Sequence, residues 1–167
     1  MKRNRSLALA IAALAIAPIA FGADVSVLGV TVGSEASFTA VDGNTSLYKA
    51  DTAFGAYTGT TNFTYKIRTT LVGGSGSITV LVTEFSGTGG PAIADLTYTC
   101  SAPAPGSPCP SSTAASTSTA SSVVSFGADA HSADTGDAGA TVWTLVDQPQ
   151  MKTGNYTVTA TYTISAV

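Results

Sequence analysis

The fold is decided by the stretch Phe63-Thr-Tyr-Lys-Ile-Arg-Thr-Thr-Leu-Val72, which Gly73-Gly-Ser-Gly76 separates from Ser77-Ile-Thr-Val-Leu-Val-Thr-Glu-Phe85. Apolar side chains recur at every second residue of both runs: Phe63, Tyr65 and Ile67, then Ile78, Val80 and Val82. This alternation is typical of strands with one buried face. A glycine-rich turn between two such runs predicts a β-hairpin.

The C-terminal run Tyr156-Thr-Val-Thr-Ala-Thr-Tyr-Thr-Ile-Ser165 alternates even more strictly. Tyr, Val, Ala, Tyr and Ile fall on one face, and Thr or Ser fills the other. Threonine keeps a high β propensity without adding charge, so the run predicts a strand with one buried and one solvated face.

Shorter candidate strands cover residues 25–32, 34–41, 95–100, 122–126 and 141–146, with turn-forming residues between them. No stretch repeats its apolar residues with the 3.6-residue period of a helix. We therefore expect an all-β protein, a single immunoglobulin-like antiparallel β-sandwich of roughly seven or eight strands over residues 23–167. Residues 111–122 are almost entirely Ser, Thr and Ala, which favours a flexible loop within that domain.

The first 22 residues have the pattern of a secretory signal peptide. Lys2, Arg3 and Arg5 precede an apolar run over residues 7–21, and the small residues Ala20 and Gly22 predict cleavage after Gly22. The apolar run is too short to span a membrane, so membrane insertion is not expected. We expect a bacterial protein that is secreted, in the periplasm or at the cell surface.

Charge excludes several classes of partner. Cleavage would leave 145 of the 167 residues, with four Lys and Arg against ten Asp and Glu. A chain this acidic lacks the basic surface that nucleic-acid binding requires, and it is not expected to bind anionic membranes.

The two cysteines, Cys100 and Cys109, predict one disulfide in an exported chain. A redox pair is not favoured, because the spacing is not Cys-x-x-Cys and no helix follows. The expected role is to fix a proline-rich excursion to the end of a strand.

No set of residues predicts catalysis, so an enzyme is not expected, and no metal or other cofactor is expected either. The single histidine, His131, lies in an acidic segment at residues 129–137. Its carboxylates could bind Ca²⁺, but the spacing differs from an EF-hand loop, and a solvated turn-rich loop is favoured.

Trp143 has two interpretations. It is either a core residue, as in many β-sandwiches, or a platform on which a sugar stacks together with Tyr48, Tyr57 or Tyr98. The core interpretation is favoured.

The C-terminal run, with the preceding Gly154-Asn-Tyr156, resembles the last strand of spore-coat protein U and of chaperone–usher pilin subunits. The resemblance covers about a tenth of the mature chain. It implies an immunoglobulin-like sandwich that polymerises by donating a strand. The candidate strand-donating segment is residues 25–32, with Val25, Val27, Val30 and Val32 as its apolar residues. The favoured interpretation is that this segment is the first strand of its own sandwich.

Two functions follow from these patterns. The first is an exported, non-enzymatic structural or surface-interaction protein that assembles with itself or with other surface proteins by β-strand addition. The alternative is a secreted module that binds a carbohydrate or another ligand.

Overall fold

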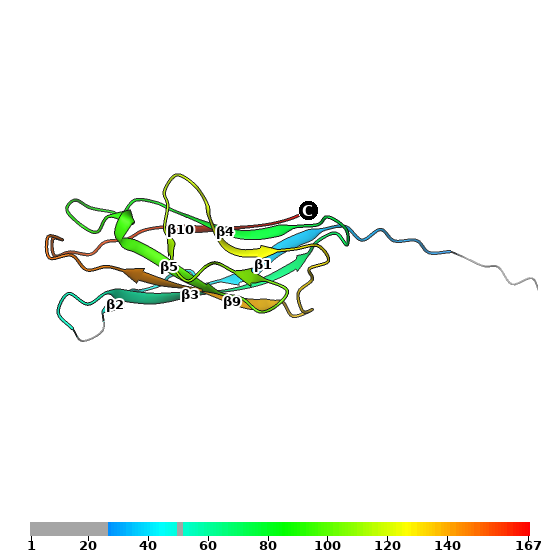
Figure 1. Cartoon of the computed structure of the whole chain (residues 1–167), viewed down its shortest axis with the longest axis horizontal. Helices are drawn as coiled ribbons and strands as arrows, with labels where there is room; N and C mark the ends of the chain where they lie inside the picture. The colour runs from blue at the N-terminus through cyan, green and yellow to red at the C-terminus, as the bar shows by residue number, and fades with distance from the viewer. Residues whose placement is uncertain (1–26, 50–51) are drawn as a thin grey trace, which may run out of the picture. The chain divides into compact units, whose positions relative to one another are not determined.

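The structure is a computed structural model that describes residues 27–49 and 52–167, and residues 32–167 form one compact unit within it. The described part is nearly all β, with one 3₁₀ turn at Ile93–Asp95 (Figure 1). Its strands form two antiparallel sheets that pack face to face, so the predicted all-β sandwich is confirmed. The predicted signal peptide lies outside the described residues.

The first sheet runs in the order β1, β3, β9, β5, β7, and β2 pairs with the start of β3. Its strands are β1 (Glu35–Val41), β2 (Tyr48–Lys49), β3 (Tyr57–Arg68), β9 (Asp137–Leu145), β5 (Leu96–Ser101) and β7 (Thr113–Ala114). The second sheet runs β10 (Ala160–Ala166), β4 (Gly76–Val82), β8 (Ser121–Phe126), β6 (Ser107–Pro108).

The core consists of the inward-facing residues that the alternation predicted. Phe63, Tyr65 and Ile67 of β3 face Ile78, Val80 and Val82 of β4, and all six are buried. The aromatic rings pack in tilted and edge-on pairs, such as Tyr65 with Phe126 at 5.4 Å between ring centroids. Such pairs add to the stabilisation that burial alone provides.

The predicted hairpin is wrong. β3 and β4 belong to different sheets, and residues 69–75 cross from one sheet to the other. Two-residue loops keep consecutive strands paired, whereas this seven-residue connection is long enough to span the separation of packed sheets, about 10 Å. Gly73 has a φ of 70°, a backbone conformation that favours glycine, where the connection turns.

The sheet orders match most of an immunoglobulin sandwich, in which strands ABED form one sheet and CFG the other. β1, β3, β9 and β5 occupy the positions of A, B, E and D, while β4 and β10 occupy those of C and F. The chain departs from that pattern in β8, which pairs with the other side of β4. No strand in the described part occupies the position of G, beside β10.

The N-terminal segment differs from the prediction of a strand over residues 25–32. Val25 lies outside the described residues, and residues 27–34 form no strand, so that prediction is wrong for the part the structure describes. The register gives a reason: Glu35 pairs with Arg68, the last residue of β3, so the residues before Glu35 have no strand of this sheet left to pair with.

The Ser/Thr/Ala-rich residues 111–122, expected as a loop, contribute β7 and the start of β8. Ala115 is buried, and its backbone N–H donates to the Leu96 carbonyl at 3.0 Å. Small side chains let this segment lie close against the edge of the first sheet.

Candidate strand-acceptor groove

The two sides of the sandwich differ, and the candidate site lies on the side formed by β1 and β10. Each is the edge strand of its sheet, and the two lie beside each other. The inward-facing residues of β10 are only half-buried, although they continue the apolar core: Ala160, Tyr162, Ile164 and Ala166. An edge strand with an incompletely covered apolar face can accept a further strand.

The hydrogen bonds show which backbone groups of β10 face outward. The carbonyls of Thr157 and Thr159 accept from Ser86 and Thr83, and Val167 exchanges two backbone hydrogen bonds with Ser75. Odd-numbered residues therefore bond toward β4 and its extensions. In an antiparallel ladder the N–H and C=O groups of successive residues point to opposite sides. The even-numbered residues 158–166 direct theirs to the edge, where no described strand pairs with them.

β1 covers part of this face. Ala36 and Phe38 are half-buried against the core, and the Phe38 ring meets Phe63 edge-on at 6.1 Å. Tyr162 lies beneath the same side, 5.8 Å from Phe63 between ring centroids, and its hydroxyl forms a hydrogen bond with Thr141 Oγ1. Burial raises the pKa of Tyr162. The register of β1 shifts between Phe38 and Ala40, and beyond the shift Ala40 and Val41 are exposed, so this end of β1 does not cover the core.

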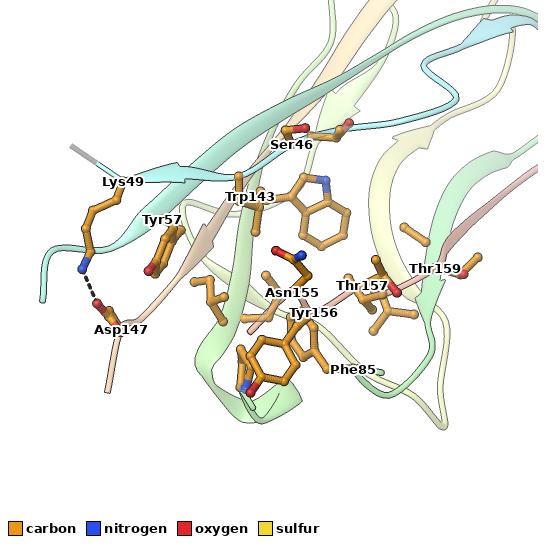
Figure 2. Close-up of a pocket in the computed structure, with 18 of the residues that line it drawn as sticks. Ser46, Lys49, Tyr57, Phe85, Trp143, Asp147, Asn155, Tyr156, Thr157 and Thr159 are labelled. Atoms are coloured by element: carbon orange, nitrogen blue, oxygen red, sulfur yellow. Dashed lines mark ion pairs between the residues drawn. The ribbon is translucent and has the colours of Figure 1, made fainter. Parts of the chain in front are cut away.

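Beyond Val41 the two edges enclose a cavity of about 1170 Å³. Residues 41–47 form one wall and residues 153–160 form the opposite wall, with buried residues of both sheets at the base. Figure 2 shows Trp143, Asn155, Tyr156 and Phe85 among the lining residues. The cavity therefore lies at the start of β10 and the residues just before it, where Val158, Ala160 and Tyr162 are among its lining residues.

Trp143 is buried, with 5% of its surface exposed, as the core interpretation expected. Its Nε1 donates to Thr61 Oγ1 at 3.0 Å, and its ring packs against Tyr98 at 5.1 Å. Of the tyrosines considered with it, Tyr98 is buried, Tyr57 half-buried and Tyr48 exposed. Trp143 therefore contributes to the base of the cavity, and these rings do not form one exposed platform.

An ion pair between Lys49 and Asp147 borders the cavity (Figure 2). The hydrogen bond to Asp147 is the main reason that the pKa of Lys49 is raised. Lys49 also lies over the ring of Tyr57, 5.1 Å from its centroid. These contacts connect β2 to the segment after β9 and fix the rim of the cavity.

The acidic segment at residues 129–137 is held by backbone hydrogen bonds to residues 67–70, such as the Ser132 N–H to the Ile67 carbonyl at 3.0 Å, and by a few contacts within itself. Asp137 Oδ1 accepts from the Ala133 N–H at 3.2 Å, and His131 Nδ1 lies 2.9 Å from the Asp129 carbonyl oxygen. Within residues 27–49 and 52–167, no three His, Cys, Asp or Glu side chains form a group that could hold a metal ion.

The opposite side of the sandwich carries the predicted disulfide, which the structure confirms. Cys100 lies near the end of β5 and Cys109 follows β6, with a Cα–Cα distance of 5.3 Å, so the bond joins the two sheets. A disulfide indicates an oxidising, extracytoplasmic environment. None of the described segments is a helix long and apolar enough to cross a membrane.

Trp143 and Tyr57, which the sequence suggested as parts of one ligand platform, both line the cavity, whereas most of the other lining residues, such as Asn155, were not predicted as parts of a site. The apolar face of the C-terminal run was a further signal, but it does not show whether a strand covers that face. Comparison with protein families, curated proteins and solved structures finds no match to this chain.

Proposed function

We propose that this protein is an exported, non-enzymatic structural protein whose copies assemble by β-strand addition. The observation that carries the proposal is the outer edge of β10. The backbone N–H and C=O groups of the even-numbered residues 158–166 point to this edge and have no strand partner in the described part of the chain. A strand added there would complete the CFG-type sheet and cover the half-buried face of β10.

The N-terminal segment of another copy is the proposed occupant. Residues 27–34 form no strand in their own chain, and the side chains of Val27, Leu28 and Val30 are exposed. In an extended conformation Leu28, Val30 and Val32 point to one face, because side chains alternate. The side chains of Val25 and Val27 would point to the opposite face of the same strand. We therefore expect Leu28, Val30 and Val32 to face the groove.

An antiparallel arrangement is the one that fits the sheet. Every strand pair of the sandwich is antiparallel, including β10 with β4. An added strand that follows the same rule would run from the Ala166 end of β10 toward Val158. Its last apolar residues would then reach the cavity, where the apolar face of β10 is least covered.

Solution mass is the first test. Size exclusion with light scattering on the exported chain should show a concentration-dependent ladder of oligomers, and deletion of residues 23–33 should leave only folded monomer. A wild-type chain that remains monomeric at all concentrations would contradict the proposal.

A matched pair of substitutions tests the face of the segment. Val30→Asp should abolish the ladder, because it would place a charge against the apolar face of β10. Thr31→Asp adds the same charge one residue later, where the side chain would point to solvent, and it should leave the ladder in place. Equal effects of the two substitutions would show that the segment does not bind as a strand in this phase.

Binding of a carbohydrate or another ligand is the alternative, and the cavity itself favours it. Pockets for small ligands are typically about 300–1,000 Å³, and this cavity, at about 1170 Å³, is of comparable size. Asn155 and Tyr57 would supply polar groups beside apolar walls. A monomeric chain whose Trp143 fluorescence shifts on addition of oligosaccharides would favour this function over strand addition.

A further inference from the structure

The end of the sandwich opposite the cavity carries two exposed aliphatic side chains, Leu71 at 71% and Val72 at 86% exposure. They lie in the connection between β3 and β4, residues 69–75, which we call the tip turn. The tip turn is firmly held at its base. The Thr69 hydroxyl donates to the Gly127 carbonyl at 2.7 Å and accepts from the Ala130 N–H at 2.9 Å.

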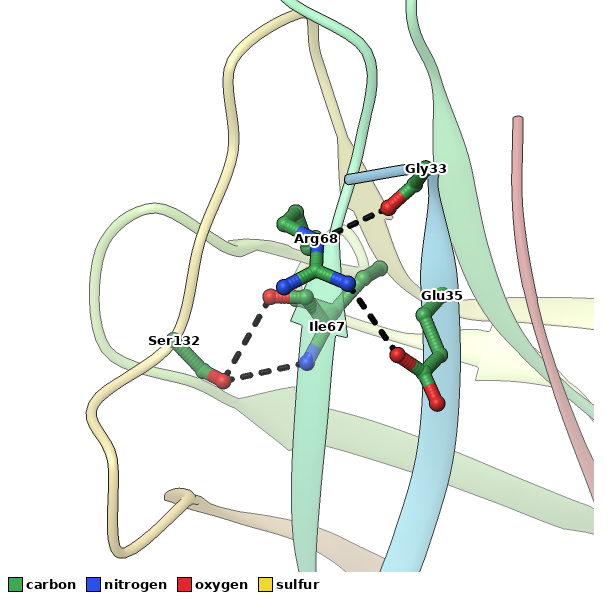
Figure 3. A network of polar contacts seen from close by, with 5 residues as sticks. All are labelled: Gly33, Glu35, Ile67, Arg68 and Ser132. Atoms are coloured by element: carbon green, nitrogen blue, oxygen red, sulfur yellow. Dashed lines mark hydrogen bonds and ion pairs between the residues drawn. The ribbon is translucent and has the colours of Figure 1, made fainter. Parts of the chain in front are cut away.

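The polypeptide enters the sandwich beside the tip turn. Arg68 Nε donates to the Gly33 carbonyl at 2.8 Å, and Arg68 Nη2 lies 3.1 Å from a Glu35 carboxylate oxygen (Figure 3). Arg68 is the residue directly before Thr69. The link between the N-terminal segment and β1 is therefore fixed at the same end of the sandwich as Leu71 and Val72.

Chain length then constrains how two copies meet. If residues 25–32 of one copy lie along β10 of another, only Gly33 and Ser34 connect the donated strand to Glu35 of its own sandwich. Two residues between these points span about 10 Å at most. The tip end of the donating copy must therefore lie close to the receiving copy, at whichever end of β10 the donated strand finishes.

We infer that the tip turn of one copy docks at the mouth of the cavity of the next copy, an inference that rests on the proposed strand addition. An antiparallel donated strand finishes beside Val158, at the cavity end. Leu71 and Val72 then face the apolar rim residues Val41, Leu47, Phe54 and Met151. The partner is a second copy of this chain, joined head to tail, and a contact between unlike ends propagates as an open filament.

The composition of the two ends supports this pairing. An exposed pair of aliphatic side chains on a rigid turn is costly in water, and it gains free energy when an apolar surface covers it. The charged pair at the rim, Lys49 with Asp147, is already mutually bonded and would not be left unpaired by an apolar neighbour. The cavity lining also includes Asp42, whose carboxylate accepts two hydrogen bonds from Asn62, and Lys152, so the docked side chains would have to meet the apolar residues between these charges.

Cysteine cross-linking within assembled oligomers tests the contact. Both native cysteines are joined to each other, so an introduced thiol reports on its own neighbours. A mixture of Val72→Cys chains and Thr153→Cys chains should give about tenfold more disulfide-linked dimer than Val72→Cys mixed with Thr99→Cys, because neighbours held in one assembly have a high effective concentration. Thr153 lines the cavity, whereas Thr99 is exposed in the middle of β5.

The outcomes separate this inference from strand addition itself. Oligomers that form without the Val72–Thr153 cross-link would overturn the end contact while leaving strand addition intact. Cross-linking of Val72→Cys chains with one another would also overturn the proposed end contact, because it would show that the tip turns of two copies meet. That arrangement is expected if the donated strand runs parallel to β10. A chain that forms no oligomers would overturn both.

A second variant measures what the contact contributes. The double substitution Leu71→Ser and Val72→Ser should still allow oligomers to form but should make them exchange subunits about tenfold faster, because aliphatic surface is lost from the interface. The matched control is Leu81→Ser, which removes a partly exposed aliphatic side chain from the outer face of β4. Equal exchange rates for the two variants would contradict the docking of the tip turn.

Discussion

The two sides of this sandwich close in different ways. On one side, β6 and β7 extend the sheets, and the disulfide between Cys100 and Cys109 joins them covalently. On the other side, β1 and β10 lie beside each other, without backbone pairing between them, over half-buried residues. We call these the disulfide side and the open side.

The difference shows that the covalent bond and the more complete burial of the core lie on the same side. The disulfide side places small residues, two short strands and a covalent bond over the core, and Val123 and Val124 beneath it are fully buried. On the open side Phe38 and Tyr162 are only half-buried, and a cavity separates the two edges beyond Val41. A side that is left open while the other is cross-linked is the one available for a partner strand.

The largest expected effect comes from closing the open side within one chain. Appending Asn-Gly and a copy of residues 25–32 after Val167 would place that segment antiparallel to β10, through a four-residue turn that joins Ala166 to the copy of Ser26. Burial of three aliphatic side chains, at about 2–3 kcal/mol each, and about four new backbone hydrogen bonds, at about 1 kcal/mol each, exceed the cost of ordering eight residues, at about 1 kcal/mol each, so the fold should be stabilised by about 3 kcal/mol. Thermal denaturation should then show a midpoint about 10 °C higher, and the oligomer ladder should disappear.

The control for that variant carries serine in place of Leu28, Val30 and Val32 in the appended copy. It should unfold at the same temperature as the unextended chain and keep the ladder. A stabilised chain that still forms the full ladder would show that the β10 edge is not the site of assembly.

Removal of the disulfide tests the other side. Replacing both Cys100 and Cys109 by serine should cost about 2–3 kcal/mol of unfolding free energy, since a loop this short gives a modest entropic constraint. Urea denaturation measures this loss, and reduction of the wild-type protein is the matched control. The ladder of oligomers should persist below the new unfolding midpoint. Loss of assembly without loss of stability would contradict the division of roles between the two sides.

The sequence predicted which residues face the core but not which strands are neighbours. Alternation identified the inward residues of β3, β4 and β10, because burial of one face selects for apolar side chains at every second position. It placed β3 and β4 in one hairpin, since both strands have the same pattern whether they pair side by side or face each other across the core. Pairing depends on the path of residues 69–75, which periodicity does not encode.

The candidate site was predictable in part for the same reason. The valines of residues 25–32 were identified as a segment that could add to a sheet, and the part of it that the structure describes forms no strand. The acceptor was not identifiable, because an open edge is defined by the absence of a neighbour in space. The cavity also depends on residues as distant in the chain as Leu47 and Asn155.

A smaller effect is expected at alkaline pH. Burial, with a contribution from the negative charge of Asp137, raises the pKa of Tyr65 to about 12. The unfolded chain ionises this hydroxyl near pH 10, so between about pH 10 and 12 the unfolded state binds fewer protons than the folded state. Stability is therefore fully present below about pH 10 and should fall by about 1.4 kcal/mol per pH unit above it.

Urea midpoints measured from pH 9 upward check this dependence, and Tyr65→Phe should flatten it. At neutral pH the same substitution should cost nothing, because the Tyr65 hydroxyl is buried without a hydrogen-bond partner in the structure. A steep alkaline loss that survives in Tyr65→Phe would assign it to Tyr98 and Tyr162, whose pKa values burial also raises.

The smallest effects compare one hydroxyl on each side. The Tyr98 hydroxyl, on β5, donates to the Ser122 carbonyl of β8 at 3.0 Å, while Tyr162 of β10 bonds to Thr141 of β9. Tyr98→Phe should cost about 1 kcal/mol, because it removes a hydrogen bond between the sheets where water has no access. Tyr162→Phe should cost about half as much, because water entering from the cavity can replace the lost bond. Chemical denaturation of both variants measures the difference in unfolding free energy. Equal losses would show that water has no better access to Tyr162 than to Tyr98. The open side would then leave less room for a partner strand than the proposed assembly needs.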